Sequence, residues 1–211
     1  MNKSKSNLIV TVITAVVAIA AMAAVIYVLA TGSHKKPDPV WAPDDAYYTE
    51  LDTASDELLA NNYKVFATYM QYGLNTAAPA YNTTPADGAY FVKDEEFTSF
   101  ADIERIVNST FVEAEATRII ENCTGTGQIY AEKEGKLIMY KDLFTAKEYD
   151  LGWSAPLVTY KSPTPDSVEL SIELDEVTYT EDSEVPTGEK KTLTVTMLKE
   201  GDSWKLAKLI Y

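Results

Sequence analysis

The side chains that most often carry catalysis are scarce in this sequence. His34 is the only histidine and Cys123 is the only cysteine. Ser-His-Asp and Cys-His catalysis needs an imidazole beside the nucleophile, and a zinc site needs several such ligands. The sequence therefore argues against both kinds of site. It also contains no phosphate-binding glycine loop, so we expect a domain that is not an enzyme and needs no cofactor.

Carboxylates are abundant, and three runs of them could hold a hard cation or form a catalytic pair. These runs are Asp44-Asp45, Asp94-Glu95-Glu96 and Glu181-Asp182. In a chain with 32 acidic and 18 basic residues, such runs are more typical of solvated loops. We favour that interpretation and expect no metal site.

Aromatic residues suggest a different chemistry, that of recognition. The chain has 14 tyrosines and three tryptophans, and tyrosine suits a surface that must be apolar and hydrogen-bonding together. The alternative interpretation is that these rings fill the concave side of a sheet. The candidates for a partner-binding surface are Tyr81, Tyr140, Tyr149, Trp153 and Tyr160.

The charge balance limits the partners of the chain. All 32 acidic residues lie from Asp38 onward, whereas four of the 18 basic residues precede it, which leaves 14 basic residues against 32 acidic ones. A surface with a net charge of −18 repels phosphate backbones. We therefore expect no nucleic-acid partner, and a basic protein or a cationic ligand remains possible.

Near its N-terminus the chain has an apolar run at 8–30, which has no charged residue. It is long enough to cross a bilayer, and it exceeds the apolar part of a secretory signal peptide. We predict a cytoplasmic tail at 1–7, a transmembrane signal anchor at 8–30, a proline-rich stalk at 31–46 and an extracytoplasmic domain at 47–211. Cleavage after Ala30 remains an alternative.

Helical periodicity dominates the first half of the domain. Apolar residues, with Tyr72 among them, recur at helical spacing from about Thr53 onward, and Gly73 ends the predicted helix. Ser99 and Asp102 resemble a capping box that starts a second helix. A third helix is predicted after Phe111.

Strand patterns dominate the second half. A short strand is predicted at 89–92, a hairpin at 128–132 and 136–141, a strictly alternating strand at 168–175 and a further strand at 192–198. Glu176 breaks the alternation as a bulge would. The sequence therefore predicts an α+β domain with two to three helices packed on a curved antiparallel sheet, either cystatin-like or cone-shaped.

The order and spacing of these elements resemble the cystatin-like and nuclear-transport-factor-like group, over roughly residues 55 to 211. Within it the chain resembles the IseA family of DL-endopeptidase inhibitors, through Ala89–Val92, Phe97–Glu104 with Phe111, and Tyr130 with Glu134–Leu137. That resemblance implies a bacterial, exported protein that restrains NlpC-type cell-wall hydrolases. The anchor and the acidic hairpin at 175–191 depart from a freely secreted inhibitor.

Three functions are compatible with the sequence. We expect a single-pass protein of the cell membrane whose extracytoplasmic domain inhibits a cell-wall DL-endopeptidase by occluding its active site. The alternatives are a structural subunit of a membrane secretion or conjugation machine, and a sensor that binds a small ligand inside a curved sheet. The membrane contact is expected at residues 8–30.

Overall fold

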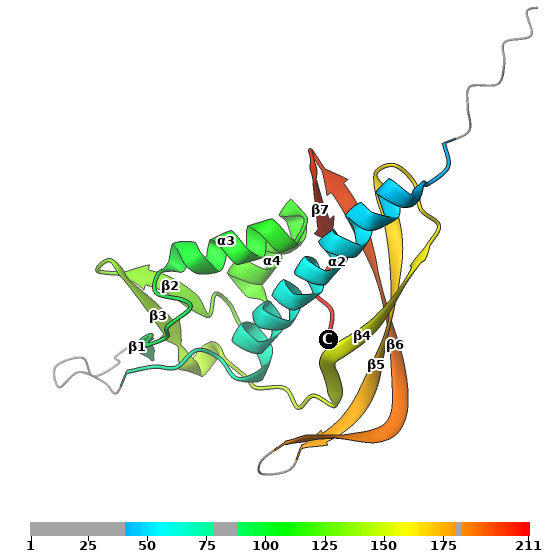
Figure 1. The fold of residues 1–211 in the computed structure, drawn as a ribbon. Helices are drawn as coiled ribbons and strands as arrows, with labels where there is room; N and C mark the ends of the chain where they lie inside the picture. Colours follow the sequence, from blue (N-terminus) through cyan, green and yellow to red (C-terminus); the bar gives the residue numbers. More distant parts are fainter. Residues whose placement is uncertain (1–40, 78–87, 180–182) are drawn as a thin grey trace, which may run out of the picture. The chain divides into compact units, whose positions relative to one another are not determined.

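The structure, a computed structural model, describes residues 41–77, 88–179 and 183–211, and Ala42–Tyr211 forms one compact unit (Figure 1). Its elements in chain order are α2 (Asp45–Phe66), the π-helical turn η1 (Ala67–Gln71), β1 (Ala89–Phe91), α3 (Phe100–Thr110), α4 (Glu113–Asn122), β2 (Tyr130–Lys133), β3 (Lys136–Tyr140), the 3-10 turn η2 (Lys141–Leu143), β4 (Leu151–Lys161), β5 (Ser167–Tyr179), β6 (Glu184–Glu200) and β7 (Ser203–Leu206).

The predicted tail at 1–7, the anchor at 8–30 and the stalk up to residue 40 lie outside the described residues. Across the parts of the chain that the structure describes, no helix is both long and apolar enough to cross a membrane. The anchor therefore stays a prediction from the sequence.

The first helix of the domain begins earlier than its apolar periodicity predicts. The carboxylate of Asp44 accepts a hydrogen bond of 2.9 Å from the backbone N–H of Tyr47, so it caps α2 at Asp45. The predicted start at Thr53 was wrong, and the last two residues of the predicted stalk belong to this helix. Asp45, Ala46, Thr49 and Glu50 in its first turns are exposed, so they interrupt the apolar pattern from which the helix was predicted.

The two shorter helices lie close to their predicted positions. Ser99 and Asp102 form the predicted capping box: the Asp102 N–H donates to Ser99 Oγ, and the Asp102 carboxylate accepts from the Ser99 N–H. Helix α4 follows, as predicted after Phe111, and buries Ala116 and Ile119 completely.

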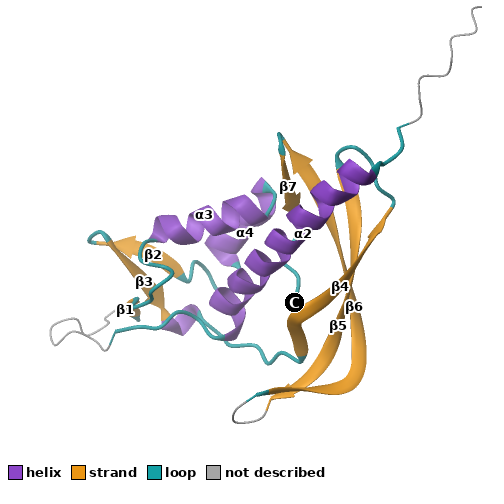
Figure 2. Cartoon of the chain, viewed as in Figure 1, coloured by secondary structure: helices purple, strands orange, loops and turns teal. Residues whose placement is uncertain are grey.

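The strands form two antiparallel sheets instead of the one that the sequence predicted (Figure 2). The smaller sheet has the order β1-β3-β2, and the larger has the order β4-β5-β6-β7. In the smaller sheet, Glu134 and Gly135 have positive φ angles of 55° and 71°, which suits the tight turn of the predicted hairpin. The α+β class and the antiparallel, curved character of the larger sheet are confirmed.

Strand β5 forms the centre of the larger sheet and follows its predicted alternation. Val168, Leu170, Ile172 and Leu174 are at most 1% exposed, so one face of the strand lies in the core. The register against β6 shifts between Asp175 and Val177, which confirms the bulge predicted at Glu176.

One continuous apolar core joins the helices to both sheets. Phe66 of α2, Tyr69 of η1, Phe111 before α4 and Tyr130 of β2 are its large, fully buried rings. The Tyr69 and Tyr130 rings meet edge to face with centroids 5.2 Å apart. Described residues from Leu51 to Ile210 thus share one core.

Candidate functional site

A cavity of about 640 Å³ opens where η1, the segment before β4 and the bulge of β5 meet. We call it the aromatic groove. Its volume lies within the usual range for ligand pockets, about 300–1,000 Å³. It is lined by Gln71, Tyr72, Lys147, Glu148, Tyr149, Asp150 and Val177.

Backbone hydrogen bonds hold the walls of the groove together. The N–H of Lys147 donates to the carbonyl of Met70 at 2.6 Å, which fixes the segment before β4 against η1. The N–H of Val177 donates to the carbonyl of Asp150 at 2.7 Å, which fixes the same segment against the bulge. The groove is therefore largely preformed, because its three walls are tied to one another.

An aromatic network supports the floor of the groove. The Tyr149 ring lies against Phe66 of α2, with centroids 4.4 Å apart. Trp153 in β4 donates its indole N–H to the Tyr149 hydroxyl at 2.9 Å and stacks on Tyr63, with centroids 6.3 Å apart. These contacts hold the half-buried Tyr149 in one orientation, so it is a fixed part of the wall.

The one lysine of the lining is engaged with a ring beside the groove. The Lys147 ammonium lies 4.6 Å from the centroid of Tyr211 and donates to the Tyr211 hydroxyl at 3.3 Å. Tyr211 in turn stacks on Phe66, with centroids 5.6 Å apart. The positive charge is therefore partly compensated by a cation–π contact.

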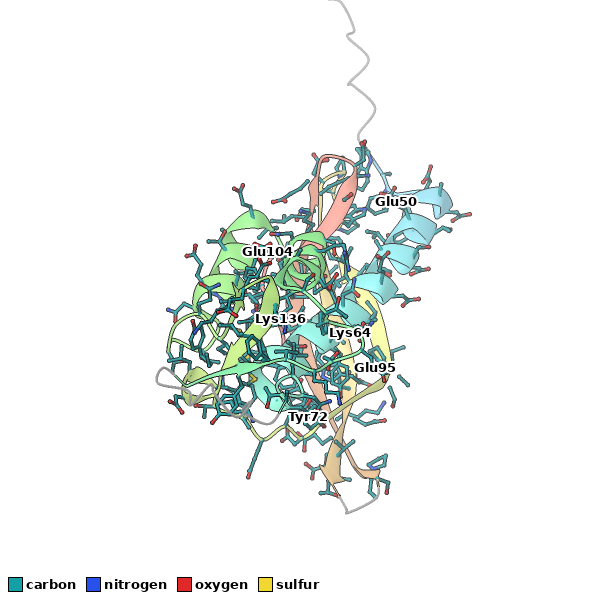
Figure 3. The ribbon with its side chains drawn as sticks, turned by 90° about the vertical axis from the view of Figure 1, so that its left-hand side faces the viewer. Glu50, Lys64, Tyr72, Glu95, Glu104 and Lys136 are labelled. Atoms are coloured by element: carbon teal, nitrogen blue, oxygen red, sulfur yellow. The ribbon has the colours of Figure 1, made fainter. Side chains whose placement is uncertain are left out.

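Two neighbouring residues of the lining have opposite environments. Tyr72 is 64% exposed, a high value for a large ring, and it directly follows η1, where Figure 3 labels it. Gln71 is only 8% exposed, and its side-chain carbonyl oxygen has no hydrogen-bond partner among the described residues. A buried acceptor without a partner costs about 1–3 kcal/mol, so this residue is unusual in the core.

Sequence reasoning wrongly placed Tyr72 on the apolar stripe of the first helix. The helix changes to π-helical geometry over Ala67–Gln71, and the residue that such a turn adds shifts the phase of every later side chain. Tyr72 is thereby turned to solvent while Gln71 is turned inward. Because a π turn has no simple sequence signature, no pattern in this chain could have identified either residue.

Two of the five predicted binding residues gather at this site, namely Tyr149 in the wall and Trp153 behind it. Tyr160 lies farther along β4 in the seam with α2. Its hydroxyl donates to the Asp52 carboxylate at 2.7 Å and lies 2.9 Å from the Ser55 hydroxyl. Burial raises the pKa of Tyr160 to about 12, so this residue helps to join helix and sheet.

The other two predicted residues are elsewhere. Tyr140 lies at the end of β3 in the smaller sheet, opposite Ala89. Tyr81 lies outside the described residues. Of the four described candidates, Tyr149 and Trp153 belong to the groove, whereas Tyr140 and Tyr160 lie outside its lining.

The acidic runs serve local structure where they are described. Asp44 caps α2, and Asp94 accepts hydrogen bonds from the N–H groups of Glu96 and Phe97. Glu181-Asp182 lies outside the described residues. No group of three potential metal ligands occurs in the described ranges.

Cys123 is buried, and burial raises the pKa of its thiol to about 11. A protonated, inaccessible thiol is a poor nucleophile. Cys123 therefore acts as a small apolar residue of the core.

No protein-family model matches the chain, and no curated protein matches it.

Proposed function

We propose that this chain is a membrane-anchored, extracytoplasmic and non-enzymatic regulator, which inhibits an NlpC-type DL-endopeptidase of the cell wall by binding it through the aromatic groove. The observation that carries the proposal is the exposed ring of Tyr72 beside a preformed, aromatic-walled cavity. Exposed tyrosines on rigid supports are typical anchors of protein interfaces.

The arrangement of helix and sheet supports the same proposal. Side chains of α2 contact β4 through Tyr63 with Trp153 and through Ser55 with Tyr160. We propose that this is a variant of the cystatin-like arrangement, in which a curved sheet wraps a helix. Residues 8–30 would then hold the domain at the outer face of the membrane.

Inhibition of peptidoglycan digestion tests this function. The full chain, purified in a mild detergent, is added to a purified NlpC-type endopeptidase, and released peptide fragments are measured. We expect saturable inhibition by the unchanged chain and a loss of about tenfold or more in potency for Tyr72→Ala, as for an interface anchor.

Leu157→Ala is the matched control, because Leu157 is also exposed, at 59%, but does not line the groove. It should inhibit as the unchanged chain does. The proposal is wrong if several such enzymes are not inhibited, or if Tyr72→Ala inhibits as well as Leu157→Ala.

A second candidate function is the binding of a small ligand by the same cavity. The observation in its favour is the unpartnered carbonyl of Gln71, which a ligand donor could satisfy. Native mass spectrometry of the chain isolated from its host would detect a retained small molecule. Its loss in Gln71→Leu, together with unchanged folding, would favour this candidate over the regulator.

A further inference from the structure

The lining of the groove offers hydrogen-bond acceptors in excess of donors. Glu148 and Asp150 contribute carboxylates that form no ion pair with a described residue. Gln71 adds a buried carbonyl oxygen that has no partner among the described residues. Lys147 is the only cation among the described lining residues, and it contacts Tyr211. A ligand that fits these walls must donate hydrogen bonds and carry positive charge.

The same walls also present apolar surface. Val177 follows the bulge of β5, Tyr149 accepts a hydrogen bond from Trp153, and the Tyr72 ring faces solvent. A flat cation stacks on an exposed tyrosine ring, while its aliphatic stem can cover the apolar wall. The groove is therefore suited to a cationic group at the end of an aliphatic side chain.

A second cavity of about 500 Å³ contains a carboxylate that is already hydrogen-bonded within the protein. It lies between α2, the end of α3 and β7. There the Glu50 carboxylate already accepts hydrogen bonds from Lys199 at 2.7 Å and from the Trp204 indole at 2.8 Å. The acceptors of the aromatic groove lack such internal partners among the described residues, so they remain available to a ligand.

We propose that the aromatic groove receives an arginine side chain from the partner protein. The guanidinium would stack on Tyr72 and donate to the carboxylates of Glu148 and Asp150, and its stem would contact Val177 and Tyr149. Arginine suits these walls because its planar donors pair with carboxylates and its face stacks on rings. The identity of the partner rests on the regulator proposed above, whereas the choice of side chain rests on the groove.

A titration with short blocked peptides tests the inference directly. The full chain, in a mild detergent, is titrated with acetyl-Gly-Arg-Gly-amide and with the neutral citrulline counterpart, and backbone NMR shifts are followed. We expect saturable shifts at Tyr72, Tyr149 and Val177 with the arginine peptide. The citrulline peptide should bind about tenfold more weakly or worse, since it is neutral and cannot make charge-assisted hydrogen bonds to the carboxylates.

Paired charge variants separate the groove from the general charge of the chain. Glu148→Gln with Asp150→Asn should weaken the arginine peptide about tenfold or more. Glu132→Gln with Glu134→Gln removes the same charge from the exposed hairpin of the smaller sheet, and it should leave affinity nearly unchanged. Equal binding of the two peptides, or equal effects of the two double variants, would overturn the inference.

The two proposals can fail separately. If the chain inhibits an endopeptidase and the Glu148→Gln, Asp150→Asn variant inhibits equally well, the arginine site is wrong while the regulator stands. If the arginine peptide binds as expected but no endopeptidase is inhibited, the groove is correct and the proposed partner is wrong.

Discussion

Asn62 shows how a single polar side chain fixes the end of the chain. It is fully buried in α2. Its amide N–H donates to the Ile210 carbonyl at 2.8 Å, and its carbonyl accepts from the Ile210 N–H at 3.0 Å. It thus satisfies two backbone groups that water cannot reach. Tyr211, which follows, is thereby held against Phe66 beside the groove.

Removal of this side chain should destabilise the domain. Asn62→Ala leaves both Ile210 groups unsatisfied, so we expect a loss of about 3 kcal/mol in the free energy of unfolding. Asn61→Ala is the control, since the neighbouring side chain is only half-buried, and it should change stability by about 0.5 kcal/mol or less. Urea titration measures both, and similar losses in the two variants would contradict this role.

The capping box of α3 makes a specific prediction about acid. Hydrogen bonds from Ser99, and further ones from Thr98 and Arg105, hold the pKa of Asp102 well below its usual range. A folded-state pKa below the unfolded value stabilises the fold above that unfolded value, near pH 4, and the contribution is lost as pH falls toward the folded pKa.

The stability of the unchanged chain should therefore decrease below about pH 4. In Asp102→Asn this part of the decrease should be absent, although the variant should be less stable at neutral pH. Urea titrations from pH 2 to 7 measure the difference, with the exposed Glu121→Gln as control. A pH profile of Asp102→Asn parallel to that of the unchanged chain would show that the cap has no electrostatic role.

The role of a side chain could be predicted from the sequence where it depends on neighbouring residues. The direction in which a side chain points could not be predicted where it depends on the helix geometry before it. Ser99 and Asp102 were recognised because a capping box occupies neighbouring positions. The exposure of Tyr72 and the burial of Gln71 depend on the π turn that precedes them. Tyr149 and Trp153 were therefore among the residues predicted from the sequence, whereas the roles of Tyr72 and Gln71 required the structure.

At the scale of elements, Gly73 ends the α2–η1 helix and borders the groove. Its φ of 68° lies in the left-handed region, and an added Cβ would lie 2.8 Å from Met139 Cε and 3.3 Å from the Phe144 ring. Only glycine adopts this conformation without strain. Because glycine has no Cβ, the chain can turn here close to Met139 of β3.

We expect Gly73→Ala to cost about 2–3 kcal/mol, from the left-handed backbone and the crowding together. Gly125→Ala is the matched control, because Gly125 has a φ of 83° but open space around its Cβ position. It should cost about 1 kcal/mol. Thermal or urea unfolding compares them, and equal costs would show that the contacts with Met139 and Phe144 have no effect.

Strands with strict alternation were predicted correctly, and the strand without it was missed. β5 alternates because one face is buried and the other is solvated. β4 is an edge strand whose register against β5 shifts between Gly152 and Leu157. Pro156 lies in that irregular stretch, and proline is tolerated mainly at edges and bulges. The edge position and the irregular register both disturb the alternation of apolar and polar residues from which strands are predicted.

At the scale of the whole molecule, the number of sheets could not be read from local patterns. Whether successive strands join one sheet or two depends on contacts between residues far apart in the chain. Here one apolar core joins both sheets to the helices. The α+β class followed from the order of elements, whereas the division into two sheets required the structure.

The charge of the whole chain adds a physical condition on binding. A net charge of −14 attracts a basic partner over a distance that salt shortens. An arginine in the groove would add a contact that is partly sheltered from solvent. Affinity should therefore fall with salt, while the dependence on Tyr72 should persist at every salt concentration.

Calorimetric titration of the full chain with a purified NlpC-type endopeptidase, at low and moderate salt, tests the central claim most directly. We predict saturable binding whose affinity falls with salt. Tyr72→Ala should lower this affinity about tenfold or more, and Leu157→Ala should leave it unchanged. The absence of binding across several such enzymes would contradict the regulator. Binding with equal affinity in both variants would contradict the groove as its site.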